Sequence, residues 1–278
     1  MELTVLVDNN TLIDHYFEGE PGLSFLLIDD GKKILFDLGY SDLFLKNANR
    51  MGLRLDDVDT IVFSHGHIDH TGGIFHFLNH MAEASFEKRP FRVPEIICHP
   101  LALEEKNEHG ACYIGTPVGK KTIERCISCR YSKDPYWITD NLVFLGEIPK
   151  KIDFESRKSI GKVCICGKEE QDILLDDSAL AYRTDKGIVI ITGCSHAGIC
   201  NIVSHAKKIC NEERIIDIIG GLHLLNPDRE VMGGTVDYFR KNKITAAHAC
   251  HCTDLASKIE LSKACKIIEV GVGMTLKY

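Results

Sequence analysis

The chain has 278 residues, of which 44% are hydrophobic and 26% are charged, and its formal net charge is -7 at pH 7. This composition is typical of a globular protein with a sizeable core, and it excludes intrinsic disorder. A mildly acidic chain does not attract nucleic acid as a whole, and short basic runs such as 150–151 and 207–208 indicate solvated surface. We therefore expect a small-molecule substrate and no nucleic-acid partner.

The N-terminal residues 1–8 lack the basic segment and the long apolar core of a signal peptide. No apolar run reaches the roughly 18 residues that a membrane span needs. We therefore expect a cytoplasmic protein with no membrane association, and a homo-oligomer is left open. Because thiols stay reduced in the cytosol, the 12 cysteines are expected to be buried thiols or metal ligands.

Apolar spacing and turn signals predict the elements in chain order. The first half is predicted as strands 4–8, 23–28 and 33–36, helix 42–51, strand 60–63, a loop and helix over 70–84, and strand 96–98. The stretch 104–161 is less regular, and we interpret it as an insertion or lid over the site. The second half is predicted as strands 173–175, 179–183 and 187–192, helix 199–210, strand 215–219, helix 234–242, strand 245–249 and helix 255–265.

Polar residues follow several of these apolar strands, a placement typical of α/β enzymes. The strongest case is Ser64-His65-Gly66-His67-Ile68-Asp69-His70-Thr71-Gly72-Gly73, directly after the strand 60–63. Imidazole and carboxylate groups are the usual ligands of zinc and similar ions. Because scattered surface or core histidines rarely cluster this densely, the segment predicts a metal centre on His65, His67, Asp69 and His70.

The pattern His65-x-His67-x-Asp69-His70 resembles the signature of the metallo-β-lactamase superfamily. The resemblance implies an α/β fold, a four-layer αβ/βα sandwich with two sheets inside and helices outside, as a single domain over 1–278. It also implies one or two divalent metal ions, with His65 and His67 on the first and Asp69 and His70 on the second. Zinc is the expected ion, and manganese and iron suit the same ligands.

Other segments extend the resemblance across the chain. The segment 35–39, Leu-Phe-Asp-Leu-Gly, is similar to the early aspartate strand of the superfamily, in which Asp37 would support the ligand loop. The segments 192–199, 220–224 and 251–253 resemble a narrower subfamily. Its members are similar to an archaeal pterin-pathway enzyme, 7,8-dihydropterin-6-methyl-4-(β-D-ribofuranosyl)aminobenzene-5'-phosphate synthase.

Two ligand positions depart from the superfamily pattern. Where the superfamily has a bridging aspartate after a glycine, this chain has Gly193-Cys194. We favour His196 for this position, with the thiolate of Cys194 as the alternative ligand and a buried, metal-free Cys194 as a third interpretation. The last histidine of the pattern is expected to be His251. The usual mid-chain histidine has no clear counterpart, and its replacements would be His99, His109, Asp176 or Asp177.

The residues expected to act on substrate are Asp69 and His223. Asp69 would hold or orient the nucleophile, and His223, after an apolar strand and two glycines, would protonate a leaving group. Metal binding and a structural hydrogen bond are the alternatives for His223. Asn10 and Ser195 are expected to orient substrate or ligands.

Two close cysteine pairs form a separate pattern, Cys126-x-x-Cys129 and Cys164-x-Cys166. Four such thiols could bind a second, structural zinc ion or an iron–sulfur cluster. Because the second spacing is tighter than usual, free thiols are the favoured interpretation.

The site predicts a metal-dependent hydrolase in which a metal-activated water attacks an ester or phosphoester. The resemblance implies an alternative, a pterin-pathway transferase in which the metals activate a diphosphate leaving group. A non-catalytic, metal-dependent sensor is the third interpretation, and the complete set of ligands disfavours it.

Overall fold

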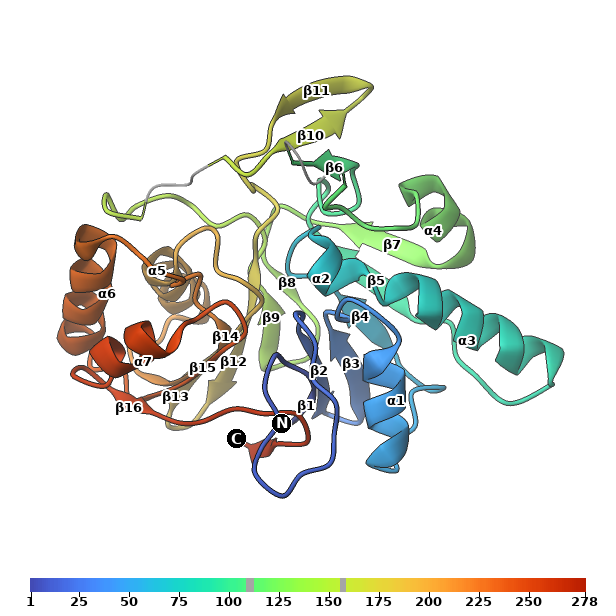
Figure 1. The fold of residues 1–278 in the computed structure, drawn as a ribbon, viewed down its shortest axis with the longest axis horizontal. Coiled ribbons are helices and arrows are strands. Elements are labelled where there is room, and N and C mark those ends of the chain that lie inside the picture. Colours follow the sequence, from blue (N-terminus) through green and yellow to red (C-terminus); the bar gives the residue numbers. More distant parts are fainter. Residues whose placement is uncertain (109–112, 156–158) are drawn as a thin grey trace. The chain divides into compact units, whose positions relative to one another are not determined.

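The structure is a computed structural model that describes residues 1–108, 113–155 and 159–278. The chain forms two compact units. The first comprises Met1–Ser132, Ser159–Asp172 and Gly271–Tyr278, and the second comprises Lys133–Lys158 and Ile173–Val270. Both ends of the chain therefore belong to the first unit. Figure 1 marks them N and C.

The main sheet of the first unit has seven strands, β1 (Glu2–Val7), β2 (Ser24–Asp29), β3 (Lys32–Phe36), β4 (Thr60–Val62), β5 (Glu95–Cys98), β7 (Ser128–Tyr131) and β17 (Thr275–Lys277). Their order is β17-β1-β2-β3-β4-β5-β7. The pairs from β17 to β3 are antiparallel, and the pairs from β3 to β7 are parallel. The carboxyl ends of β3, β4 and β5 therefore lie at the same edge of the sheet.

The helices of this unit are α1 (Leu43–Arg50), α2 (Ile68–Thr71), α3 (Ile74–Phe86) and α4 (Lys120–Cys126). Parallel strands need crossover connections, and α1, α3 and α4 lie in the connections that follow β3, β4 and β5 (Figure 1). Their apolar faces join the strands in one core cluster, which includes Phe44, Phe77, Ile123, Leu35, Ile61 and Ile96. This packing fixes the strand ends from which the histidine segment emerges.

A small sheet in the first unit consists of β6 (Lys106–Asn107), β10 (Lys162–Ile165) and β11 (Lys168–Gln171), in the order β11-β10-β6. The irregular stretch 104–161 thus supplies β6 here and β7 to the main sheet, and it also supplies two strands of the second unit. The single domain over 1–278 and the lid over the site stay predictions.

The sheet of the second unit consists of β8 (Tyr136–Trp137), β9 (Leu142–Phe144), β12 (Ala179–Thr184), β13 (Gly187–Thr192), β14 (Ile215–Gly221), β15 (Ala246–Cys250) and β16 (Lys266–Ile267). Its order is β16-β15-β14-β13-β12-β9-β8, and β13 to β16 are parallel. The helices α5 (Ile199–Cys210), α6 (Arg229–Lys241) and α7 (Leu255–Leu261) lie in the crossovers. They share a core with the strands that includes Ile202, Phe239, Leu261, Ile190, Ile218 and Ala247.

Most predicted elements are present within a few residues, but the strand at 173–175 is wrong. Leu174 has a positive φ of 55°, and the amide of Asp177 donates to its carbonyl, so the segment turns instead of pairing. The two aspartates that follow favour a turn over a strand. Helix α6 also begins five residues before the predicted start at 234, because Asp228 caps it by accepting a hydrogen bond from the amide of Val231.

Asp254 caps α7 and is expected to contribute to stability in a pH-dependent way. Its carboxylate accepts hydrogen bonds from the amides of Asn226 and Ser257, at 2.6 and 2.7 Å, and these bonds lower its pKa below the ordinary 3.8. Asp254→Ala should reduce the free energy of unfolding by about 0.5–2 kcal/mol at neutral pH. Because the folded pKa is the lower one, this contribution is present above pH 3.8 and is lost as pH falls through the folded pKa. Urea unfolding of the wild-type and Asp254→Ala proteins at neutral and acidic pH measures this contribution. An equal difference in the free energy of unfolding at both pH values would contradict the expected pH dependence.

Among the helices that the structure describes, none combines the length and the apolar character needed to cross a bilayer. The cysteines in the described ranges are all free thiols. Several of them are buried, as expected, but Cys126 and Cys166 are exposed.

Candidate metal centre

One group of the predicted ligands lies where β3 and β4 of the first unit end. Asp37 follows β3 and is fully buried, and its two carboxylate oxygens accept hydrogen bonds from the amide and the hydroxyl of Ser64 at 2.8 and 2.7 Å. Ser64 is the second residue after β4 and directly precedes His65. The carboxylate therefore ties the start of the histidine segment to the neighbouring strand.

The same network orients two imidazoles. Nδ1 of His70 lies 2.7 Å from Asp37, and Nδ1 of His65 lies 2.9 Å from the hydroxyl of Ser64. Because the Ser64 hydroxyl donates to Asp37, the hydrogen-bond pattern places a proton on Nδ1 of His65. The same tautomer at His70 would present Nε2 of both rings as the ligand atom, the arrangement expected of metal-binding histidines.

The predicted donors of the first unit lie together. The ring centroid of His65 is 4.7 Å from that of His67 and 4.3 Å from that of His70, and a carboxylate oxygen of Asp69 lies 3.7 Å from Nε2 of His70. His67 is the N-cap of the short helix α2, which carries Asp69 and His70. One strand end and one helical turn thus bring the four side chains into a single cluster.

A buried ion pair packs against the histidine segment, and no sequence pattern predicts this pair. Nζ of Lys106 lies 2.6 Å from the carboxylate of Asp172, and both residues are at most 2% exposed. Gly66 sits against them, since a Cβ added there would be 2.2 Å from the carbonyl oxygen of Ala102 and 2.7 Å from Cε of Lys106. Glycine is therefore required at position 66 by close approach of the neighbouring backbone.

Another group of the predicted ligands lies at the end of β13 in the second unit. The hydroxyl of Ser195 donates to the carbonyl of Gly221 at 2.7 Å and lies 2.8 Å from the hydroxyl of Thr192, so it holds the loop to the adjacent strand. The amide of Ala197 donates to the buried carboxylate of Asp177 at 2.8 Å. These contacts fix the loop that carries Cys194 and His196.

Side chains from three neighbouring parallel strands gather at this edge. A ligand atom of His196 and one of His251 each lie within 4.8 Å of Sγ of Cys194. The ring centroids of His196 and His223 are 4.2 Å apart, and His223 is exposed. Cys194 and His196, the two candidates for the central ligand position, are therefore near each other.

Cys252 belongs to this cluster, although sequence reasoning assigned it no role. Its Sγ accepts a hydrogen bond from the amide of His223 at 3.3 Å and lies 3.5 Å from the carbonyl oxygen of Cys194. Burial alone would raise the pKa of this thiol, but hydrogen bonds with Cys194 and His223 lower that pKa well below its usual range. Its position directly after His251, at the end of an apolar strand, is the signal that could have identified it.

Four of the residues at these strand ends have left-handed backbones. The φ angles of Asp37, Ser195, His223 and His251 are 57°, 61°, 51° and 51°. Such conformations are uncommon for residues other than glycine, and they cluster at functional sites. Their recurrence after β3, β13, β14 and β15 supports the interpretation of these strand ends as functional.

The remaining predicted residues lie elsewhere or play local roles. Asn10 is exposed, and its amide donates to Asp8. His99 is buried, with Nδ1 accepting from the amide of Leu101, and Asp176 is also buried. His109 lies outside the described residues. In the described ranges, none of Cys126, Cys129, Cys164 and Cys166 belongs to a group of three ligand atoms within 4.8 Å of one another.

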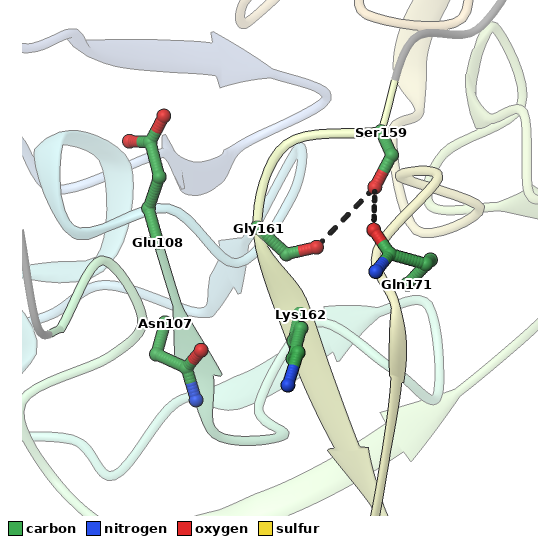
Figure 2. A pocket seen from close by; sticks show the side chains of 6 residues that line it. All are labelled: Asn107, Glu108, Ser159, Gly161, Lys162 and Gln171. Atoms are coloured by element: carbon green, nitrogen blue, oxygen red, sulfur yellow. Dashed lines mark hydrogen bonds between the residues drawn. The ribbon is translucent and has the colours of Figure 1, made fainter. Parts of the chain in front are cut away.

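A pocket of about 540 Å³ opens beside the small sheet of the first unit. Figure 2 shows its six lining residues, Asn107, Glu108, Ser159, Gly161, Lys162 and Gln171. The hydroxyl of Ser159 bonds to Gln171 and Gly161, while Lys162 pairs with Glu169. Because much of its polar lining is engaged within the sheet, we assign it no part in the candidate centre.

The comparisons with known proteins place the chain in a family. A model described as the metallo-β-lactamase superfamily matches residues 18–86. The 7,8-dihydropterin-6-methyl-4-(β-D-ribofuranosyl)-aminobenzene-5'-phosphate synthase of Methanocaldococcus jannaschii is 33% identical over 247 residues, which cover 85% of this chain and 82% of the synthase. The chain belongs to the metallo-β-lactamase superfamily. An uncharacterized protein of the same organism is 30% identical over 274 residues and covers 98% of each chain.

A solved structure confirms the fold class. Tm1679, described as a metal-dependent hydrolase of the β-lactamase superfamily, is 29% identical, with a TM-score of 0.83 over 100% of this chain and 99% of that one. The predicted α/β, metallo-β-lactamase-like fold is therefore confirmed, and so is the resemblance to the pterin-pathway synthase. The two relatives carry different activities in their names, a synthase and a hydrolase.

Asp37→Asn is expected to weaken metal binding by about 10–100-fold, because the carboxylate orients His70 and the segment that carries His65. Competition with a chromophoric chelator measures this affinity. Asp217→Asn is the matched control, since Asp217 is a buried aspartate 2.8 Å from Nδ1 of His248 within the sheet of the second unit. The control should lower stability and leave metal affinity unchanged. Equal affinity losses in both variants would show that Asp37 acts only through folding.

Proposed function

We propose that the protein is a metal-dependent hydrolase of a small ester or phosphoester and that it works in the cytoplasm. The observation that carries the proposal is the network in which Asp37 and Ser64 orient His65 and His70. Membership of the metallo-β-lactamase superfamily supports the metal requirement. The likeness to a protein described as a metal-dependent hydrolase supports hydrolysis.

The donor set fits a divalent ion. His65, His67 and His70 offer imidazole nitrogens and Asp69 offers a carboxylate, which suits zinc, with manganese and iron as alternatives. On the superfamily pattern, His196 and His251 complete the ligands, and Cys194 is the sulfur alternative to His196. Zinc is the ion that we propose.

Divalent ions bound at such a centre supply Lewis acidity, which lowers the pKa of water and stabilises negative charge that develops in the reaction. Asp69 would orient the attacking nucleophile through its carboxylate. Nε2 of His223 would hold the proton that passes to the leaving group, and the exposure of this side chain leaves it accessible to substrate. Asp37 and Ser64 would keep the imidazoles in one tautomer throughout.

A second candidate is a pterin-pathway transferase. The 33% identity to the dihydropterin-methyl-aminobenzene ribofuranosyl phosphate synthase favours it. The same residues would then bind a diphosphate leaving group, and the step would join two organic fragments without adding water. The two candidates share the metal site. They differ in the group that attacks the substrate, which is water in the hydrolase and an organic acceptor in the transferase.

The test begins with elemental analysis of protein purified without added metal. A panel of phosphodiester, phosphomonoester, lactone and thioester substrates is then assayed in heavy-oxygen water, before and after chelation. We expect a zinc-bound protein whose chelation-sensitive product carries the solvent label. A condensed pterin product from a dihydropterin diphosphate and an aminobenzene acceptor, with no solvent oxygen, would favour the transferase. A protein that binds no divalent ion contradicts both candidates.

A further inference from the structure

Two cysteines meet at the carboxyl edge of the sheet in the second unit. Cys194 follows β13 and Cys252 follows β15, the two strands that flank β14. Sγ of Cys252 lies 3.5 Å from the carbonyl oxygen of Cys194, to which its thiol donates a hydrogen bond. A disulfide requires two cysteines at close range, and this contact brings the sulfur of Cys252 against Cys194.

The strand between them leaves space for the sulfur. β14 ends at Gly221, where an added Cβ would lie 2.6 Å from Sγ of Cys252. The amide of His223 donates to the same sulfur at 3.3 Å, which holds it in place. Cys194 is 4% exposed, whereas Cys252 is half-buried, so Cys252 is the more accessible residue of the two.

We propose that Cys194 and Cys252 form a reactive dithiol that hydrogen peroxide converts into a disulfide. The sulfur of Cys252 attacks peroxide, the O–O bond breaks, and a sulfenic acid and one water form. The sulfur of Cys194 then attacks that sulfur, the S–O bond breaks, and a second water leaves. Two thiols lose two electrons and two protons in all, and one peroxide is reduced to two waters.

This chemistry goes beyond the proposed enzyme function, because it needs neither substrate nor metal. It also bears on the metal centre. If Cys194 rather than His196 is the central ligand, the disulfide removes a sulfur donor from that centre. A bound ion would then slow the oxidation.

The test uses the full chain after dialysis against a chelator. The protein is treated with hydrogen peroxide, alkylated without reduction and digested with trypsin. Cleavage after Lys186, Lys207, Lys243 and Lys258 gives the peptides 187–207 and 244–258. We expect these peptides to be linked in the treated protein and separated again by dithiothreitol.

Each peptide contains a second cysteine, Cys200 or Cys250, so single substitutions assign the bond. Cys194→Ser and Cys252→Ser should each abolish the linked peptide, and the matched controls Cys200→Ser and Cys250→Ser should retain it. A linked peptide that persists in Cys252→Ser overturns the proposal. Wild-type protein that forms only sulfinic and sulfonic acids overturns it as well.

A measurement on the unaltered chain covers the case in which a variant fails to fold. Phenylarsine oxide binds two close thiols with loss of one water, so it should protect both Cys194 and Cys252 from alkylation. Alkylation of either cysteine in its presence contradicts the dithiol. Because the experiment involves no catalysis, a result that contradicts the dithiol does not contradict the proposed hydrolase function. Absence of hydrolase activity likewise does not contradict the dithiol.

Discussion

His67→Ala is expected to remove both the bound metal and turnover. His67 would supply one of the four predicted donors of the first unit, and its ring lies 4.7 Å from that of His65. The loss should exceed the roughly 10–100-fold effect of a residue that only orients a ligand. Elemental analysis and the rate of chelation-sensitive hydrolysis measure the two effects on one preparation.

The matched control is His76→Ala, because His76 lies on α3 of the same unit, contacts Phe75 and belongs to none of the candidate metal-ligand groups among the described residues. The control should keep its metal and its rate. A His67→Ala protein that turns over substrate at the wild-type rate without metal would refute the proposed mechanism. Circular dichroism of both variants separates a local loss from unfolding.

Lys106→Met is expected to lower the free energy of unfolding by about 3–5 kcal/mol, the largest stability effect that we anticipate in this chain. Methionine retains most of the apolar stem that packs against Gly66. It removes the ammonium group, however, and leaves the carboxylate of Asp172 buried and uncompensated. Denaturant unfolding monitored by circular dichroism gives the difference.

Two controls separate the ion pair from simple packing. Lys162→Met breaks an exposed pair with Glu169 on the neighbouring hairpin and should cost at most about 1 kcal/mol. The double variant Lys106→Met/Asp172→Leu replaces the whole buried pair with apolar groups and should recover most of the loss. If the double variant is as unstable as the single one, packing rather than charge is responsible.

The sequence predicted the elements and the histidine segment because both depend on local information. An apolar strand followed by His65-x-His67-x-Asp69-His70 is a short-range pattern, and the parallel strands placed Cys194, His223 and His251 at strand ends. The strand at 173–175 was wrong because its apolar residues resemble a strand, while the turn at Leu174 depends on a backbone conformation that no pattern reveals.

Longer-range partners could not be predicted. Lys106 and Asp172 are 66 positions apart, and each alone is an ordinary charged residue. Cys252 was part of a recognised segment, but its contact with Cys194 across β14 depends on how three strands end. Ser64 was read only as the start of the motif, and its link to Asp37 required the registry of β3 and β4.

At the four strand ends, residues with left-handed backbones carry side chains that the proposed centre uses, although glycine would fit these backbone conformations better. Each holds a conformation that glycine would adopt at no cost and that other residues adopt at a cost of order 1 kcal/mol. Glycine at Asp37, Ser195, His223 or His251 would thus relax the backbone and delete a side chain that the proposed centre uses. At Asp37 and Ser195 the exchange would also remove the hydrogen bonds with Ser64 and Gly221, so thermostabilising changes belong elsewhere in the chain.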